Sequence, residues 1–292
     1  MSPFISLLLL STSPHDAGAY QPHVGRRTVV PSRRWAPQLA ALDCFSSMTE
    51  TYQSLASRCI DLFAGRDGAL WVCIAGGPGS GKSTLSEAVS RCCEEVHGVP
   101  SVVLPMDGFH YSRAELRELD PPDAASFLPR RGAPHTFDAE SFFAALGEGK
   151  KTGAAQLPTY SRELSDPVLG GAVLEPKHQI VFVEGNYLLL GALLEPPCEE
   201  LSSAEEAEAA RWKPLLSLFD ETWFVAPPEG VQEQRRRLVE RHLETWTPEK
   251  TVAWGASTAR EGATKRTDFN DVPNAHLVEK CRRCADVVVD SV

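Results

Sequence analysis

The sequence contains no apolar run of the roughly 18–20 residues that a bilayer-spanning helix needs, so we expect no membrane span. Basic side chains are also scarce. The 29 lysines and arginines stand against 39 acidic residues, which gives a formal net charge of −10 at pH 7. A general nucleic-acid binder needs a concentrated basic surface to displace counterions, so nucleic acid is not an expected partner. The sequence also has no internal repeat.

Paired cysteine motifs are missing as well. The eight cysteines show no CxxC…CxxC spacing of the kind that encloses zinc. The single CxxC, from Cys281 to Cys284, is compatible with a redox pair or with half of a zinc site, but no second pair of ligands lies nearby in the sequence. We therefore interpret it as two reduced thiols at the end of a helix.

The composition is that of an ordinary globular protein, with 42% hydrophobic and 23% charged residues over a length of 292. Residues 1–42 differ from the rest, because they carry one acidic residue and four arginines. A short apolar run followed by an acid-poor Arg/Ser/Pro stretch indicates a disordered targeting leader. The order of its parts resembles the plastid leaders of algae with complex plastids. The alternatives are a mitochondrial leader, a secretory signal, or an upstream extension of a cytoplasmic protein that starts at Met48.

From residue 70 onward, strand-like and helix-like patterns alternate. Short apolar runs predict buried parallel strands at residues 70–75, 101–106, 179–183, 221–225 and 285–290. Between them, helices are predicted at residues 82–96, 139–146, 229–243 and 274–284. The alternation predicts one α/β domain over residues 43–292, with a mostly parallel five-stranded sheet and helices on both faces.

Two stretches interrupt this alternation. Residues 120–137 are rich in proline, arginine and glycine, and we expect them to form neither helix nor strand. Residues 194–212 are acidic and rich in alanine. We expect them to form an exposed insertion helix whose charges are solvated.

Residues 76–84 match the phosphate-binding pattern G-x-x-x-x-G-K-[ST], or Walker A motif, between a predicted strand and a predicted helix. Glycines let the backbone curl so that N–H groups point at phosphate oxygens, and the helix N-terminus adds its positive end. The motif predicts a P-loop NTPase fold with ATP and Mg²⁺ as cofactors; the alternative is a glycine-rich turn. The predicted nucleotide-binding residues are Gly76, Gly77, Pro78, Gly79, Ser80, Gly81, Lys82, Ser83 and Thr84.

Lys82 and Ser83 have specific predicted roles within the loop. Lys82 neutralises charge on the β- and γ-phosphates, and the hydroxyl of Ser83 binds Mg²⁺. Asp107 and Glu184 each follow another predicted strand. We expect the strand before Asp107 to lie beside the strand of the loop, so that Asp107 can accept a proton from an acceptor hydroxyl near the γ-phosphate. Glu184 is predicted to lie near Mg²⁺.

Each acidic prediction has a simpler alternative. Asp107 and the glycine after it can form a plain turn, and Glu184 can be an ordinary acidic residue at a strand end. Two arginines of the charged helix, Arg237 and Arg241, are four residues apart and share one face. They could stabilise the charge of a transferring phosphoryl group; the alternative is a solvated basic face paired with neighbouring glutamates.

Together these motifs resemble the uridine kinase, pantothenate kinase and phosphoribulokinase family of P-loop kinases, from about Trp71 to the C terminus. The similarity is closest to the uridine-kinase-like members of uncertain substrate. True uridine kinases usually have DxFY where this chain has MDGFHY. Pantothenate kinases share the DGF of this chain, but the rest of their pattern is absent. The matching blocks are GGPGSGKST, MDGFH, RRGAPHTFD, PTYSRELSDPV, VEGNYLLL, RRRLVERH and NDVPNAHLV.

The resemblance implies roles for further residues. Asp107 matches the catalytic base of the family, and Glu184 matches the acid near the metal. Arg237 and Arg241 match a helical lid near residues 230–262. Asn270 and Asn274 fall where the adenine edge of ATP is approached. The acceptor is expected to contact Phe109, Tyr111, Arg130, Arg131, His135, Asp138 and Tyr160.

We therefore expect an ATP-dependent phosphotransferase that moves the γ-phosphoryl group to an alcohol group of a small metabolite. A nucleoside, a sugar and a pantothenate-like molecule are the expected classes of acceptor, and a homodimer is an expected assembly. The alternative is a P-loop ATPase or switch protein that acts on a protein partner through the acidic stretch at residues 194–212.

Overall fold

The computed structural model describes residues 40–41, 48–119, 127–161, 163–195 and 201–291. The predicted leader lies outside them apart from Ala40–Ala41, so it stays a prediction. No helix in the described ranges combines the length and the apolar character that crossing a membrane requires.

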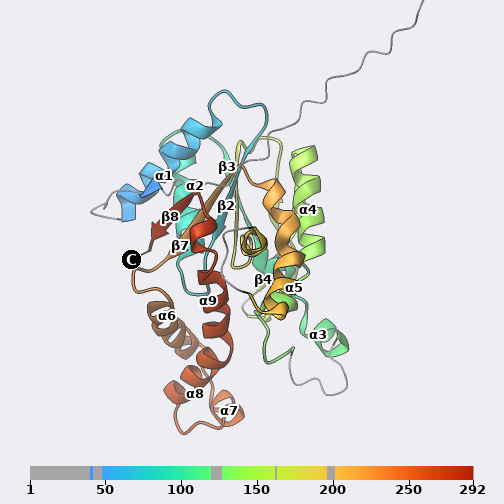
Figure 1. Ribbon diagram of the computed structural model, residues 1–292, viewed down its shortest axis with the longest axis vertical. Helices are drawn as coiled ribbons and strands as arrows, with labels where there is room; N and C mark the ends of the chain where they lie inside the picture. The colour runs from blue at the N-terminus through green and yellow to red at the C-terminus, as the bar shows by residue number, and fades with distance from the viewer. Residues whose placement is uncertain (1–39, 42–47, 120–126, 162, 196–200, 292) are drawn as a thin grey trace, which may run out of the picture. The chain divides into compact units, whose positions relative to one another are not determined.

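A parallel sheet with helices on both faces forms the centre of the protein, as the sequence predicts (Figure 1). Its strand order is β1-β8-β7-β2-β6-β3, and every neighbouring pair is parallel. Five strands correspond to the five predicted ones: β2 (Leu70–Ala75), β3 (Ser101–Pro105), β6 (Ile180–Gly185), β7 (Glu221–Ala226) and β8 (Val287–Asp290). A sixth, β1 (Ala40–Ala41), pairs with β8 at the edge and was not predicted.

The strand of the phosphate-binding loop lies in the middle of the sheet. β2 pairs with β6 on one side and with β7 on the other, and all six of its residues are buried. β6 separates β2 from β3. The expectation that the strand before Asp107 lies beside β2 is therefore wrong, because β6, which comes later in the chain, lies between β2 and β3 and pairs with both.

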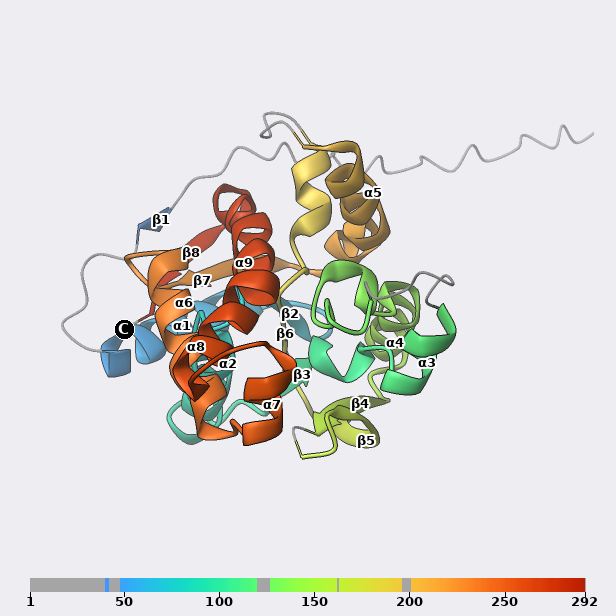
Figure 2. The ribbon, with the colours of Figure 1, turned by 90° about the horizontal axis from the view of Figure 1, so that it is seen from below.

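The two faces of β2 contribute to two separate hydrophobic cores. Leu70, Val72 and Ile74 pack with α1 (Met48–Phe63) and α2 (Lys82–Glu95). The alternate residues of β2 pack with side chains from the helices of the opposite face. These helices are α4 (Ala139–Thr152), α5 (Ser203–Trp212) and α9 (Val272–Glu279). Figure 2 shows the sheet between these layers. Because both faces are covered, the strands are apolar throughout.

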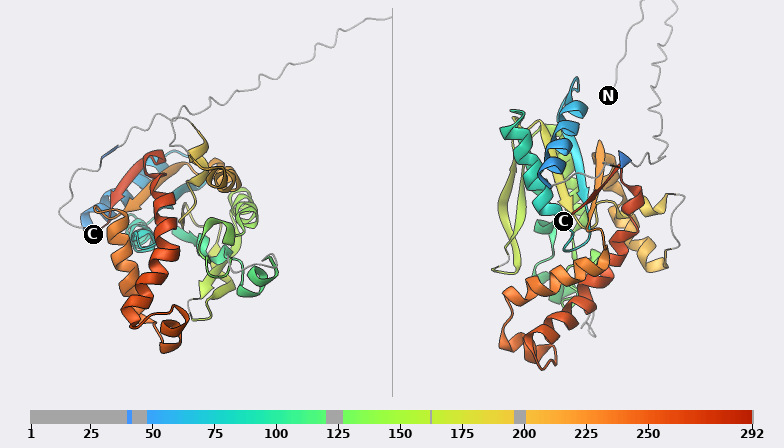
Figure 3. Two further views of the ribbon diagram at one scale, coloured as in Figure 1. Left: turned by 60° about the horizontal axis from the view of Figure 1, so that its bottom comes forward. Right: turned by 90° about the vertical axis from the view of Figure 1, so that its left-hand side faces the viewer.

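A group of helices follows β7 in the region of the predicted lid. They are α6 (Val231–Glu244), α7 (Pro248–Ala253) and α8 (Ala259–Arg266). A π-helical turn, Thr267–Asp271, joins α8 directly to α9. α6 and α9 run side by side in Figures 1 and 3, and they are in contact. We refer to α6–α9 as the lid, and their action as a lid stays a prediction.

An antiparallel hairpin and several short helical segments were not predicted. The hairpin consists of β4 (Ala155–Ser161) and β5 (Asp166–Leu174). A short helix, α3 (Arg113–Leu119), precedes it. The 3₁₀ segments are Met106–Phe109, Pro134–Thr136, Leu190–Leu194, Lys213–Leu218 and Arg282–Cys284.

The acidic stretch forms a helix, α5, that is exposed on one side and buried on the other. Ser202 caps it through a capping box with Glu205, and Trp212 is completely buried. The ring of Trp212 contacts the rings of Phe137 and Tyr187 at centroid distances of 6.0 and 5.5 Å. The prediction of an exposed insertion helix is therefore wrong for one side of α5, because Ala209 and Trp212 on that side are buried in the core.

Candidate active site

The phosphate-binding loop lies at the carboxyl end of β2 and leads into α2, which begins at Lys82. Gly81 caps the helix with a φ of 89°, a left-handed conformation that glycine adopts without strain. A Cβ on Gly76 would lie 2.4 Å from the carbonyl oxygen of Val225 and 2.6 Å from the hydroxyl of Ser80. The loop therefore needs these glycines for its path, and it places Lys82 and Ser83 in the first helical turn.

Glu184 lies beside the start of α2. The hydroxyl of Ser83 donates to its Oε2 at 3.1 Å, and the side chain is buried. Burial raises the pKa of Glu184; the charge of Lys82 opposes this rise and the charge of Asp107 adds to it. The loop, Glu184 and Asp107 therefore share one electrostatic environment at the carboxyl edge of the sheet.

Asp107 lies in the 3₁₀ turn that follows β3. Pro105, two residues earlier, pairs with Glu184 in the sheet register, so the two acidic residues are on adjacent strands. A Cβ on the next residue, Gly108, would lie 1.9 Å from the carbonyl oxygen of Pro158. Glycine at this position thus lets β4 pass directly against the Asp107 turn, a contact that a plain Asp-Gly turn does not require.

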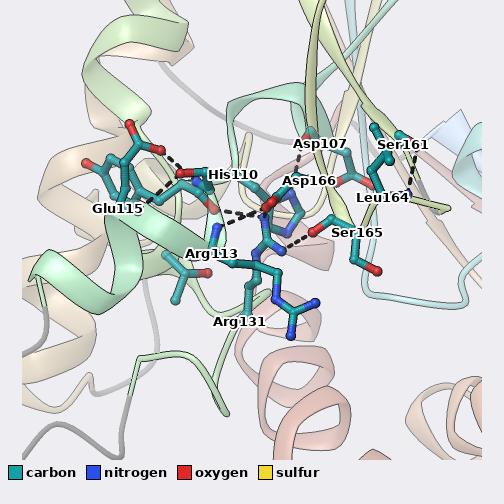
Figure 4. A network of polar contacts seen from close by, with 12 residues as sticks. Asp107, His110, Arg113, Glu115, Arg131, Ser161, Leu164, Ser165 and Asp166 are labelled. Atoms are coloured by element: carbon teal, nitrogen blue, oxygen red, sulfur yellow. Dashed lines mark hydrogen bonds and ion pairs between the residues drawn. The ribbon is translucent and has the colours of Figure 1, made fainter.

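Arg131 joins the hairpin to the segment after Asp107 (Figure 4). It donates to the Tyr111 carbonyl at 2.9 Å, to Asp166 Oδ1 at 2.8 Å and to the carbonyl of Ser165. Its guanidinium lies 5.4 Å from the ring centroid of Tyr160. Burial raises the pKa of Tyr160, and the charge of Arg131 opposes that rise. Tyr111, Arg131 and Tyr160, three predicted acceptor residues, are brought together.

Three other predicted acceptor residues have contacts that support the fold. Phe109 is buried against Phe142, with ring centroids 4.7 Å apart. Asp138 caps α4 by accepting from the backbone N–H of Ser141 at 2.9 Å. The ring of His135 packs on Phe127 at 5.1 Å, and burial lowers its pKa. Their role toward an acceptor stays a prediction.

Asn270 and Asn274 are buried beside the arginine segment of residues 130–131. The Nδ2 of Asn270 donates to the carbonyl of Arg131 at 2.7 Å, and Asn274 Oδ1 accepts from Arg130 at 3.2 Å. Arg130 also donates to the carbonyl of Phe269. Both asparagines thus tie the lid to this segment, and contact with adenine stays a prediction.

The two arginines predicted to act from the lid have different environments. Arg237 donates to Glu233 at 2.8 Å and to the carbonyl of Ser291 at 3.2 Å, whereas Arg241 is exposed. Hydrogen bonds from Arg236 and Arg237 lower the pKa of Glu233 to about 2. A cavity of about 690 Å³ opens here, lined by Pro228, Glu229, Glu233, Arg236, Arg237 and Ser291.

Sequence reasoning missed a polar chain inside the lid. Arg266 donates to Nδ1 of His242 at 2.6 Å, and His242 Nε2 donates to Asp271 Oδ2 at 2.7 Å. These two hydrogen bonds connect α6, α8 and the π-helical turn. Asp271 belongs to the NDVPNAHLV block, and its place in a block shared with the family was the signal that could have pointed to it. Asp166, the partner of Arg131, was likewise not singled out, although it lies inside the block PTYSRELSDPV.

The donors near the loop suit a magnesium ion that also binds phosphate oxygens. The Ser83 hydroxyl and the Glu184 carboxylate are hard oxygen ligands 3.1 Å apart, and Mg²⁺ is usually held by one or two protein groups in addition to substrate phosphates. In the described part of the chain, no three His, Cys, Asp or Glu side chains form a group that could hold a metal ion.

Comparison with known proteins identified relatives over most of the chain, although no family model matches it. A Schizosaccharomyces pombe protein named "Putative uridine kinase C227.14" is 34% identical over 255 residues, covering 86% of this chain and 95% of that protein. The crystal structure of a Silicibacter protein named "putative fructose transport system kinase" is 28% identical, with a TM-score of 0.63, and covers 82% of this chain and 98% of that one. The fold is also that of YFH7 from Saccharomyces cerevisiae, at 16% identity and a TM-score of 0.60, covering 84% of this chain and 99% of that one.

Proposed function

The chain belongs to the uridine-kinase-like family of P-loop kinases, and on that basis we propose that it transfers the γ-phosphoryl group of ATP to a hydroxyl group of a small metabolite. One observation carries the proposal. The phosphate-binding loop follows β2, Glu184 lies at the end of β6, and Asp107 lies in the turn after β3. These three strands are neighbours in this order, so the three groups lie along the carboxyl edge of the sheet. Ligands bind at this edge in open α/β sheets.

The proposal gives each of these groups a role. Lys82 and the helix N-terminus neutralise the phosphates, and Asp107 orients the acceptor hydroxyl and takes its proton. Ser83 and Glu184 would hold Mg²⁺, which when bound neutralises charge on the phosphate oxygens. Arg237 and Arg241 lie on α6 of the lid, from which they can stabilise charge and help to exclude water.

We place the acceptor beside Asp107, next to a group in which the ring of Tyr160 lies against Arg131 and against the imidazole of His110, with the two ring centroids 4.9 Å apart. This group offers aromatic rings and polar groups, a combination suited to a nucleoside, a sugar or a pantothenate-like molecule. The name of the S. pombe relative favours a nucleoside, and that of the Silicibacter protein favours a sugar.

Replacing the proposed base tests the function. With ATP, Mg²⁺ and a panel of nucleosides, sugars and pantothenate, we expect Asp107→Asn to lower kcat by about 100-fold or more for the accepted substrate, because the hydroxyl loses its proton acceptor. Product formation is measured by mass spectrometry. Asp61→Asn, on the exposed side of α1, is the matched control and keeps the wild-type rate. Equal rates for Asp107→Asn and wild type would overturn the assignment of the base, and no transfer to any acceptor by wild type would contradict the function.

A further inference from the structure

A buried polar side chain in the lid has no partner. Gln234 lies on α6 with 1% of its surface exposed. Neither its Oε1 nor its Nε2 makes a hydrogen bond to any of the residues that the structure describes. Leaving a buried amide unpaired costs about 1–3 kcal/mol, so a side chain of this kind calls for a functional explanation.

The amide of Gln234 lies directly against the phosphate-binding loop. A Cβ on Gly77 would lie 2.8 Å from its Oε1, and a Cβ on Gly79 would lie 3.0 Å from Cγ of Leu238. Gln234 and Leu238, four residues apart, therefore form the face of α6 that packs on the loop. Gln232 is exposed on another side of the same helix.

Gln234 lies where the loop meets two helices of the lid. The same Cβ on Gly77 would lie 3.4 Å from Cα of Ala275 in α9, and α6 and α9 are in contact. The loop is the part of the chain that binds nucleotide phosphates, and the terminal phosphoryl group is the phosphate that must also come close to the acceptor, because it is the group that moves.

We propose that Gln234 is a nucleotide-binding residue supplied by the lid, whose Nε2 donates a hydrogen bond to an oxygen of the terminal phosphoryl group of ATP. This role rests on the proposed function. A 180° rotation of the carboxamide exchanges Oε1 and Nε2 in place, so the donor can face the phosphate without movement of α6. A neutral donor adds this contact without adding charge to the loop.

The experiment compares two nucleotides that differ in the terminal phosphate. Binding of a non-hydrolysable ATP analogue and of ADP, each with Mg²⁺, is measured by isothermal titration calorimetry for wild type, Gln234→Met and the control Gln232→Met. Methionine keeps the length of the side chain and removes the amide. We expect Gln234→Met to weaken binding of the ATP analogue by about 10- to 100-fold, the range for a hydrogen bond to a charged group. ADP affinity should stay within about twofold, and Gln232→Met should change neither.

Thermal unfolding without nucleotide gives a second measurement. Because the amide is unpaired in the free protein, we expect Gln234→Met to keep or raise the melting temperature; Gln234→Leu replaces it if the methionine variant does not fold. Equal losses for both nucleotides, or a lowered melting temperature with unchanged affinities, would overturn the role of Gln234 alone. Failure of wild type to bind either nucleotide would overturn the proposed function together with this role.

Discussion

The imidazole of His110 lies against the rings of Phe137 and Tyr160, with centroids 3.9 and 4.9 Å away. Its Nδ1 donates to the carbonyl oxygen of Asp107 at 2.8 Å. Burial lowers the pKa of His110, and the charge of Asp107 opposes this effect. The ring therefore stays neutral near pH 7 and holds the backbone of the proposed base.

This lowered pKa makes stability depend on pH in a definite direction. Below about pH 6.5 the unfolded chain binds a proton that the folded chain does not, so the free energy of unfolding falls as the pH falls. We expect His110→Gln to lose less stability than wild type between about pH 7.5 and about pH 5.5. Urea unfolding at both pH values measures this difference. His97→Gln, at an exposed site, serves as the control, and an unchanged loss in His110→Gln would contradict the prediction.

At the scale of elements, the β4–β5 hairpin supports the turn that carries Asp107. Pro158 of β4 contacts Gly108 closely. On the other strand, Asp166 of β5 accepts a hydrogen bond from Arg131 at 2.8 Å. The hairpin is thus packed against the turn after β3 and is not a separate appendage of the sheet.

Alanine substitutions at two glycines test this packing. Gly108→Ala places a methyl group against the Pro158 carbonyl, and we expect a loss of about 1–3 kcal/mol in the free energy of unfolding, together with lower kcat because Asp107 moves. Gly147→Ala is the matched control, since a Cβ there meets no atom within 4 Å in the middle of α4. It should stabilise the protein by up to about 1 kcal/mol. Similar stability changes in the two variants would disprove the role of the close contact.

The elements differed in how far the sequence could predict them. The central strands are apolar on both faces, so their existence followed from sequence alone. The hairpin did not, because β4 contains Pro158 and a register irregularity between Leu157 and Thr159, and most of β5 is exposed or only partly buried. Asp107 and Glu184 were identified as strand-end acids, but strand order depends on tertiary pairing, so their adjacency was not predictable.

At the scale of the whole molecule, Arg130 connects segments that are far apart in the chain. Its guanidinium donates to Asn274 at 3.2 Å and to the Asn270 carbonyl at 3.4 Å, and it lies 5.8 Å from the ring centroid of Phe269. A contact between residues more than a hundred positions apart leaves no signal in a single sequence. The contacts of Asn270 and Asn274 with the arginine segment were therefore not predicted, and the resemblance assigned both residues only to adenine.

Replacing the planar guanidinium tests this connection. Lysine offers one compact charge and cannot make the same set of contacts, so we expect Arg130→Lys to speed amide hydrogen exchange in residues 267–278 by about tenfold. Exchange in the central strands should not change. Arg117→Lys, at an exposed site on α3, is the control, and exchange rates equal to wild type in both variants would refute the connection.

The position of β2 between β6 and β7 has a consequence for biosynthesis. Both neighbours of this strand are encoded downstream of it, so on the ribosome β2 stays without a sheet partner until residue 185 has emerged. A nascent chain shorter than this carries the complete glycine-rich loop but no framework to shape it. We therefore expect competence to bind nucleotide to arise late in translation, and an exposed apolar β2 to be a target for chaperones until then.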